Sequence, residues 1–267
     1  KSYYSVNGQI QHSDNANRIF RSYFGFISSG RASLKVDRLS IKEIDSRSNK
    51  DGTPSDVNVK ATGSGIIISK NGIIVTNHHV IDEAKNYIVE VNTPNGKVSY
   101  KAELLQKDKE NDLAILKIKD ETFVPFDAIK YSFKDGGGLE VGSSVFTIGY
   151  PYALSGMGKE AKFTDGKVSS KTGFNGAINS FQSTIPVQPG NSGGPVFNDK
   201  GQMVGVINAT YREADNVSYA IKLNYINNLI DLLADTVEHP SDNSINALSL
   251  EEKIKIITNY VVLIKVK

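Results

Sequence analysis

The chain has 267 residues, with 31 Lys and Arg against 29 Asp and Glu, so its formal net charge is only +2. This balance gives no electrostatic reason to expect nucleic acid or an anionic membrane as a partner. Because the chain contains no cysteine, disulfides, thiolate metal sites and a cysteine nucleophile are excluded, and catalysis must use oxygen or nitrogen groups.

The first 60 residues mix apolar pieces such as IFRSYFGF with polar runs such as SRSNKDGTPSD (46–56). This composition predicts an N-terminal arm or leading strand followed by a polar loop. The sequence starts KSYYSVNGQI, without Met or a signal-peptide apolar region, so we expect any signal peptide to have been removed or never present. No apolar run approaches the ~18 residues of a spanning helix, which predicts a soluble chain.

From about residue 60, short apolar runs alternate with Gly, Asn and Asp turn signals. The runs GIIIS (65–69) and GIIVT (72–76) flank KNG and predict a hairpin. Further strands are predicted at 87–91, 98–104, 113–118, 144–149, 162–170, 181–185, 195–198, 203–208 and 217–221. Many short strands without alternating helices favour barrels or a sandwich over a parallel α/β sheet, and we interpret them as two antiparallel β-barrels.

The predicted barrel domain covers 61–238, with the joint between its halves near KDGGGLEVG (134–142), where glycines cluster. At its end, apolar residues with helical spacing predict a surface helix at about 222–237. In the remaining segment, 239–267, Ser249 and Glu252 have capping-box spacing. We favour a helix there, although IKIIT and YVVLIKV are equally compatible with strands.

The stretch VQPGNSGGPVFN (187–198) places glycines around Ser192 between two predicted strands. Gly190 and Gly193 permit backbone angles closed to other residues, so this loop could direct consecutive N–H groups at one point beside the Ser192 hydroxyl. That geometry is an oxyanion hole. The alternative is an ordinary Gly-Asn-Ser turn.

A serine nucleophile needs a base and an orienting acid. His12 and His239 stand in polar surroundings, whereas the pair His78 and His79 directly follows the strand GIIVT. Asp112 precedes the apolar strand LAILKI, which suits a partly buried acid. Each of these residues has an ordinary structural explanation by itself, and their joint occurrence in the order His, Asp, Ser on a two-barrel chain favours catalysis.

This combination resembles the trypsin-like serine endopeptidases, and within them the HtrA/Deg-like bacterial branch. The resemblance covers about residues 60–235 and is carried by GSGIIISKNGIIVTNHHV (63–80), NDLAILKIK (111–119), VGSSVFTIGYP (141–151), KFTDGKVSS (162–170), IPVQPGNSGGPVF (185–197), GQMVGVINA (201–209) and YAI (219–221). It implies two antiparallel six-stranded β-barrels with a C-terminal surface helix.

The resemblance also implies the site residues. His79, the histidine directly before the apolar residue, matches the base, with His78 as a structural neighbour; Asp112 matches the acid and Ser192 the nucleophile. The backbone N–H groups of Gly190 and Ser192, with Asn191 between them, match the oxyanion hole. The implied activity is hydrolysis of polypeptides through an acyl-enzyme, in an extracytoplasmic location, periplasmic or secreted. Since the sequence shows no metal-binding cluster, phosphate loop or dinucleotide fingerprint, we predict no required cofactor or metal. The oligomeric state is left open.

Two departures from family patterns carry expectations. Animal digestive members have Asp before the nucleophile, where it pairs with a freed N-terminus, whereas this chain has Asn191; we therefore predict no ion pair between Lys1 and this position. Deg-like proteins usually append PDZ domains, but 239–267 is too short for one, which puts peptide-regulated oligomerisation in doubt.

In this fold Pro186 corresponds to the floor of the S1 pocket. Its walls correspond to Asn208, Ala209, Thr210, Ser218 and Tyr219. None of these residues is a carboxylate that could pair with Arg or Lys. The glutamyl-endopeptidase branch is also similar, but it typically carries GNSGSP and a pocket histidine where this chain has Gly194 and Ile207. We expect a small or medium uncharged P1 residue.

Two other classes of function stay open at this point. One is a latent or inactive protease-fold module that binds polypeptides as a chaperone does. The other is a non-enzymatic all-β adhesion or scaffold domain in which the three residues coincide by chance. Reaction with a serine-directed phosphonate separates an active peptidase from both.

Overall fold

The computed structural model describes residues 2–6, 9–13, 59–82, 84–134, 139–154, 157–210 and 216–267. The chain separates into two compact units, residues 1–52 and residues 53–267. The described part of the first unit is an antiparallel hairpin of β1, Ser2–Val6, and β2, Gln9–Ser13. The predicted polar loop at 46–56 lies outside the described residues.

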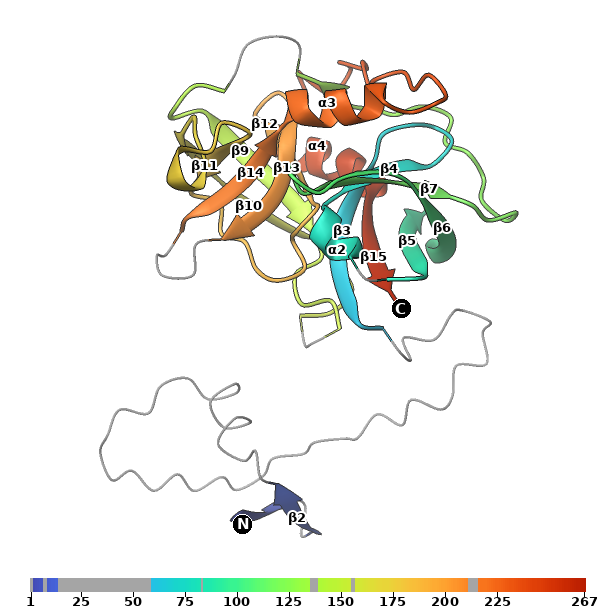
Figure 1. Ribbon diagram of the computed structural model, residues 1–267, viewed down its shortest axis with the longest axis vertical. Helices are drawn as coiled ribbons and strands as arrows, with labels where there is room; N and C mark the ends of the chain where they lie inside the picture. The colour runs from blue at the N-terminus through green and yellow to red at the C-terminus, as the bar shows by residue number, and fades with distance from the viewer. Residues whose placement is uncertain are drawn as a thin grey trace. The chain divides into compact units, whose positions relative to one another are not determined.

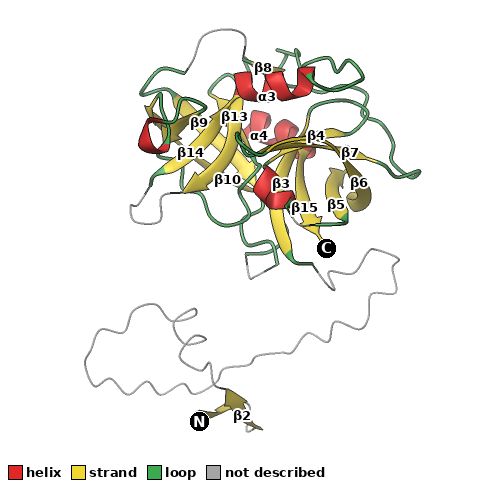
Figure 2. Cartoon of the chain, viewed as in Figure 1, coloured by secondary structure: helices red, strands yellow, loops and turns green. Residues whose placement is uncertain are grey.

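The second unit contains two barrels (Figures 1 and 2). The first is a closed ring of strands in the order β15-β3-β4-β7-β6-β5. Its strands are β3 (Ala61–Ile67), β4 (Ile73–Thr76), β5 (Tyr87–Thr93), β6 (Gly96–Asp108), β7 (Leu113–Ile118) and β15 (Val261–Val266). These segments are rich in Ile and Val, whose branched side chains pack well on a pleated surface, and β4 and β15 are buried along their whole length.

The C-terminal segment corrects a prediction. The capping box at Ser249 and Glu252 does start a helix, α4, Leu250–Ile257, which continues into a short 3₁₀ turn, η2, Thr258–Tyr260. The helix we favoured for the remainder is wrong, because the chain then forms β15, antiparallel to both β3 and β5. Figure 1 shows this red strand beside the cyan β3. The predicted domain end at 238 therefore leaves out a strand of the first barrel.

The second barrel contains strands that follow one another in the chain. They are β9 (Ser144–Gly149), β10 (Lys162–Ser170), β11 (Ser180–Ser183), β12 (Pro195–Asn198), β13 (Gln202–Thr210) and β14 (Ser218–Lys222). The ring closes because β12 pairs with both β9 and β13. A short strand, β8, Ser132–Phe133, adds to β13 in parallel. The predicted all-β, two-barrel fold is thus confirmed.

The barrels are joined by a connecting segment, and a helix follows the second barrel. The predicted joint at 134–142 lies in the connection from β7 to β9, and residues 135–138 are outside the described part of the chain. Helix α3, Leu223–Asp231, buries Leu223, Ile226, Leu229 and Ile230. It ends before the predicted residue 237, because the Leu233 N–H donates to Ile230 O and Leu232 is exposed.

One apolar core extends over the first barrel, α3 and the facing side of the second barrel, and a smaller one fills the second barrel. Among the residues that the structure describes, none of the helices has the length and apolar character that crossing a membrane requires.

Candidate active site

His79 lies just past the end of β4, in the one-turn helix α2, His78–Ile81. The apolar strand is anchored in the barrel, so the turn that follows brings His79 to the surface, with 47% of its side chain exposed. Two contacts hold this turn to the first barrel: the Asn77 side chain donates to Asp112 O at 2.9 Å, and the His78 N–H donates to the same carbonyl at 3.2 Å.

Asp112 lies at the start of β7 and has a positive φ of 51°, which is uncommon for a non-glycine residue. Its carboxylate faces His79 with both oxygens. Oδ1 accepts the His79 backbone N–H at 2.8 Å, and Oδ2 lies 2.6 Å from His79 Nδ1. A carboxylate accepts a hydrogen bond only from a protonated Nδ1, so this contact favours the tautomer whose Nε2 is available as a base.

The turn that carries Asp112 is itself held by amide contacts. Asp108 accepts both the backbone N–H and the side-chain amide of Asn111, at 3.0 and 2.6 Å. Asn111 Oδ1 in turn accepts a hydrogen bond from Nδ2 of Asn179, at 3.0 Å. Asn179 lies just before β11. The second barrel thus contributes to holding the turn that carries Asp112.

Ser192 lies in the loop between β11 and β12, and this loop docks on the first barrel. The Ser64 N–H donates to Ser192 O at 2.8 Å, and the Ser64 hydroxyl donates to Gly190 O at 2.7 Å. Gly193 has φ +83°, and a Cβ there would lie 2.2 Å from Ser64 O and Thr76 Oγ1. Only glycine allows this approach, which brings Ser192 to the end of β4 where His79 begins its turn.

The peptide between Pro189 and Gly190 has a fixed orientation. Pro189 O accepts the Tyr152 N–H at 2.9 Å, and in a trans peptide the following N–H points the opposite way. The Gly190 N–H is therefore directed away from Tyr152. Within the described residues, neither this N–H nor that of Ser192 donates to another protein group, so two neighbouring backbone donors of the loop are available for an anion.

The Ser192 hydroxyl is oriented toward the second barrel. It donates to Asn208 O at 3.4 Å, a long and therefore weak hydrogen bond. Among the hydrogen bonds of the described residues, none joins Ser192 Oγ to His79. The structure thus brings His79 and Asp112 into contact, and holds Ser192 nearby through its backbone without a bond from its hydroxyl to the imidazole.

The residues predicted for the S1 pocket lie on three neighbouring segments of the second barrel. Pro186 is exposed between the buried Ile185 and Val187. The Ser218 hydroxyl is fully buried and bonded to that of Ser183 at 2.7 Å, and the Tyr219 ring meets Phe174 edge-on at 6.2 Å.

Asn208, Ala209 and Thr210 belong to β13 beside them, where Ala209 pairs with Tyr219 and Thr210 with Ser218.

The remaining histidines differ from His79. His78 is buried, with Nε2 3.7 Å from Asp82 Oδ1, and His239 lies against Asp231 and the Phe133 ring. His12 is in β2. Asn191 is 3% exposed. Lys1 lies outside the described residues, so the predicted absence of an ion pair between Lys1 and this position stays a prediction.

Sequence reasoning missed Ser64 and Tyr150. Ser64 is fully buried and contacts Gly190, Ser192 and the Tyr150 N–H, the last at 2.9 Å to Ser64 Oγ. The available signal was a serine between two glycines at the start of an apolar strand, a position where a buried hydroxyl needs partners. Tyr150 had no comparable signal, because its partners are distant in the sequence.

Comparison with known proteins agrees with this architecture. The family model described as a trypsin-like peptidase domain matches residues 63–206. A probable periplasmic serine endoprotease, DegP-like, of Hahella chejuensis is 33% identical over 66% of this chain and 36% of its own length. The corresponding protein of Rickettsia prowazekii is 30% identical over 85% of this chain and 42% of its own length.

The magnetosome formation protease MamE of Paramagnetospirillum magneticum is 33% identical over 61% of this chain and 22% of its own length. The crystal structure of the serine endoprotease from Yersinia pestis superposes with a TM-score of 0.54 and 31% identity, covering 67% of this chain and 59% of that one. The chain thus spans less than two thirds of the length of these relatives. Since the family model matches more than half of the residues, the chain belongs to the trypsin-like peptidase family, among relatives of the DegP-like serine endoproteases.

Proposed function

We propose that the chain is a serine endopeptidase in which Ser192 is the nucleophile, His79 the base and Asp112 the orienting acid. The observation that carries the proposal is the pair of contacts from the Asp112 carboxylate to the backbone and ring of His79, at 2.8 and 2.6 Å. A single carboxylate that holds both groups fixes the ring plane and its tautomer before substrate arrives.

In the first half of the reaction Ser192 Oγ attacks the carbonyl carbon of the scissile peptide, and its proton passes to His79 Nε2. The hydroxyl must turn from Asn208 O toward the imidazole, which the 3.4 Å bond resists only weakly. Catalytic hydrogen bonds are often long in the absence of substrate. The C–N bond then breaks, the proton passes to the leaving amine, and an acyl-enzyme is left.

In the second half His79 takes a proton from water, whose oxygen attacks the ester carbon. The bond from that carbon to Ser192 Oγ then breaks, His79 returns the proton to Oγ, and the acid is released. Negative charge develops on the carbonyl oxygen in both halves. The Gly190 and Ser192 N–H groups are proposed to stabilise it, and each such donor contributes about 2.7–4 kcal/mol to transition-state stabilisation in enzymes of this type.

We further propose that the substrates are polypeptides with a small or medium uncharged P1 residue. The side chains of Pro186, Asn208, Ser218 and Tyr219 offer no charge to a P1 side chain, and the Ser218 hydroxyl is already bonded to Ser183. A peptide-library cleavage profile tests this proposal, and a profile dominated by Glu, Lys or Arg at P1 contradicts it.

An extracytoplasmic location, periplasmic or secreted, is part of the proposal because several relatives are named periplasmic endoproteases. Cell fractionation of the natural protein tests it.

The second candidate is a latent protease-fold module that binds polypeptides without turnover. The observation in its favour is the Ser192 hydroxyl, which is bonded to Asn208 O and not to His79. A binding module would retain the His79 and Asp112 contact and still fail to form an acyl-enzyme.

Fluorophosphonate labelling separates the two candidates, with casein cleavage measured in parallel. We expect the unaltered chain to label and cleave, and Ser192→Ala and His79→Ala to lose both activities. The matched control is His239→Ala, which removes a histidine that lies against Asp231 and the Phe133 ring and that no hydrogen bond or ion pair of the described residues joins to Asp112 or Ser192.

Absence of labelling in the well-folded unaltered chain would overturn the active endopeptidase and favour the latent module. Retained cleavage in Ser192→Ala would overturn the assignment of the nucleophile.

A further inference from the structure

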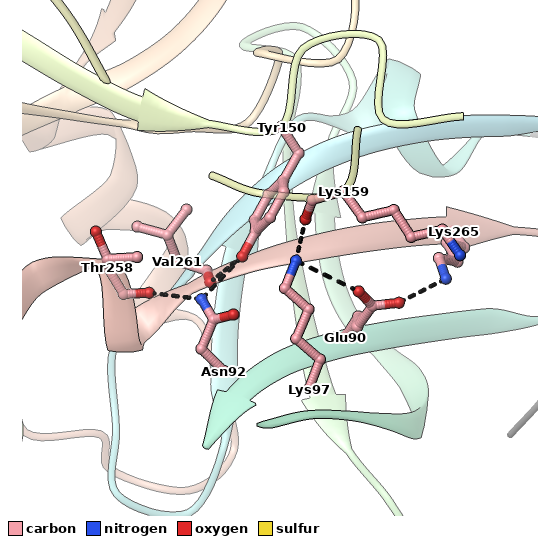
Figure 3. A network of polar contacts seen from close by, with 8 residues as sticks. All are labelled: Glu90, Asn92, Lys97, Tyr150, Lys159, Thr258, Val261 and Lys265. Carbon is pink, nitrogen blue, oxygen red and sulfur yellow. Dashed lines mark hydrogen bonds and ion pairs between the residues drawn. The ribbon is translucent and has the colours of Figure 1, made fainter. Parts of the chain in front are cut away.

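A partly buried polar cluster joins the first barrel to the segment that follows β9 (Figure 3). We define the Lys97 cluster as Glu90, Asn92, Lys97, Tyr150 and Lys265. Glu90 and Lys265, on β5 and β15, form an ion pair of 2.6 Å with side-chain exposures of 8% and 4%. Lys97 Nζ, on β6, lies 3.6 Å from the other carboxylate oxygen of Glu90.

The Lys97 side chain connects the Glu90 carboxylate to the segment after β9 through two contacts. Its ammonium group donates to Lys159 O and lies 4.9 Å from the centre of the Tyr150 ring, within the range of a cation–π interaction. Burial lowers the pKa of Lys97, an effect that Glu90 opposes. The lysine is thus kept between Glu90 and Tyr150 at some desolvation cost, which favours a role other than surface solubility.

The Tyr150 phenol is held from the other side by Asn92. Asn92 Nδ2 donates to the phenol oxygen at 2.9 Å and to Thr258 O at 3.0 Å, while the phenol donates to Val261 O at 3.3 Å. Tyr150 as a whole is 1% exposed. Its position is therefore determined by β5, by β6 and by the chain entering β15.

The backbone of Tyr150 and its neighbours contacts the loop of Ser192. The Tyr150 N–H donates to Ser64 Oγ, which donates to Gly190 O, and the Tyr152 N–H donates to Pro189 O. A Cβ on Gly190 would lie 2.4 Å from Tyr150 O. The peptide that presents the Gly190 N–H is thus packed against residues whose own position depends on the Lys97 cluster.

We propose that Lys97 and Asn92 are positioning residues for the oxyanion hole: they hold Tyr150, so that Tyr152 and Ser64 keep the peptide between Pro189 and Gly190 in the orientation that stabilises an oxyanion. This inference rests on the proposed endopeptidase activity. In the proposed arrangement, neither Lys97 nor Asn92 touches the substrate. Loss of either contact lets the segment after β9 move, the peptide rotates, and one backbone donor is lost from the transition state while substrate binding is retained.

The test compares Lys97→Met and Asn92→Ala with the unaltered chain. Lys97→Met removes the ammonium group but keeps an unbranched side chain only one atom shorter. It leaves Glu90 paired with Lys265, so the buried carboxylate keeps a partner. The control is Lys119→Met, which removes an exposed ion pair with Glu103 in the same barrel. Three quantities are measured: kcat and KM on a peptide substrate, the rate of fluorophosphonate labelling, and amide hydrogen exchange at Tyr152.

We expect kcat and the labelling rate to fall about 10- to 100-fold in Lys97→Met and less in Asn92→Ala, with KM changed by less than about twofold, since the loss of a whole oxyanion donor costs about 10²–10³. Exchange at the Tyr152 amide should become faster in both variants, because its acceptor Pro189 O is no longer fixed. The control should change none of these quantities.

Unchanged exchange at Tyr152 in both variants overturns the inference, whether or not the chain is active. Faster exchange with unchanged kcat also overturns it, because the segment would then move without effect on the oxyanion hole. If the unaltered chain neither labels nor cleaves, the proposed function fails separately, and the exchange rates still decide whether Lys97 and Asn92 hold the segment.

Discussion

The two barrels are built differently. The first barrel takes its strands from both ends of the second unit, since β15 closes a ring that otherwise consists of β3 to β7, and its strands bury an ion pair, Glu90 with Lys265. The second barrel consists of consecutive strands, and the described buried polar side chains on them are neutral: Thr147, Ser180, Ser183, Asn198 and Ser218.

This difference matches the contribution of each barrel to the site. The first barrel supplies ionisable side chains, His79 and Asp112, held by side-chain contacts. The second supplies a loop in which glycines with positive φ shape the backbone around Ser192. Changes in the first barrel should therefore act through charge, protonation or closure of the ring, and changes in the second through backbone geometry.

The largest effect is expected from removal of 261–267, which opens the first barrel. The buried side chains of β15 include Val261, Val262, Leu263 and Ile264, each with essentially no exposure. Loss of one such side chain costs about 1–5 kcal/mol, so the loss of all four is comparable to the roughly 5–15 kcal/mol that stabilises a typical domain, and the pairing of β15 with two strands is lost as well. We expect no cooperative thermal unfolding transition, measured by circular dichroism. A normal transition would show that β15 is dispensable.

Asp112→Asn tests whether the negative charge of the Asp112 carboxylate, in the first barrel, is needed to orient His79. The asparagine can still accept the His79 backbone N–H, but its amide would face Nδ1 and favour the tautomer that leaves Nε2 protonated. We expect kcat to fall about 10⁴-fold with little change in KM. The control is Asp108→Asn in the same turn, which keeps an acceptor for Asn111 and should retain activity. Equal losses in the two variants would contradict an orienting role for Asp112.

Gly190→Ala tests the backbone of the second barrel. Its φ of +103° strains any other residue, and the added Cβ would lie 2.4 Å from Tyr150 O, so the loop must shift and one oxyanion donor is lost. We expect kcat to fall about 10²–10³-fold, while the shape of the pH profile stays the same because His79 and Asp112 are untouched.

The control for this change is Gly142→Ala, just before β9. Gly142 has φ +90°, but a Cβ there meets no atom within 4 Å. It should lower the unfolding free energy by about 1 kcal/mol through backbone strain and leave kcat unchanged. A comparable loss of kcat in Gly142→Ala would mean that backbone strain, without displacement of the Ser192 loop, explains the effect of Gly190→Ala.

The sequence was informative where a signal is local. Short apolar runs between turn residues predicted strands of both barrels, and the position of His79 directly after GIIVT predicted a histidine at a strand end. The segment Val261–Val266 was ambiguous, because a strand buried on both faces has no alternation that distinguishes it from a helix. Its partners β3 and β5 are far away in the chain, and local spacing carries no information on such pairing.

The same limit applies to the site. The residue types of the proposed triad could be found from motifs, whereas the contacts that fix the loop of Ser192 could not. Ser64 bonds to Gly190, and Asn92 to Tyr150, across more than fifty residues in each case. Such contacts depend on how the barrels dock, which is a property of the assembled fold.

The smallest expected effect concerns Tyr150, where the first barrel meets the segment after β9. Burial raises the pKa of Tyr150 to about 12 from its usual 10, and Glu90 contributes in the same direction against the Asn92 hydrogen bond. Between pH 10 and pH 12, Tyr150 therefore keeps its proton in the folded chain and loses it in the unfolded chain. Stability that is fully present below pH 10 is therefore lost as the pH rises toward 12, by about 1 kcal/mol at pH 11.

Tyr150→Phe removes this titration while keeping the ring. We expect its unfolding free energy in urea to fall by about 1 kcal/mol less between pH 9 and pH 11 than that of the unaltered chain. At pH 8 the variant should be slightly less stable, by about 1 kcal/mol, because the hydrogen bond to Val261 O is lost. The two stability curves should therefore approach each other or cross at alkaline pH, and parallel curves would show that the phenol is no more protected from ionisation than in the unfolded chain.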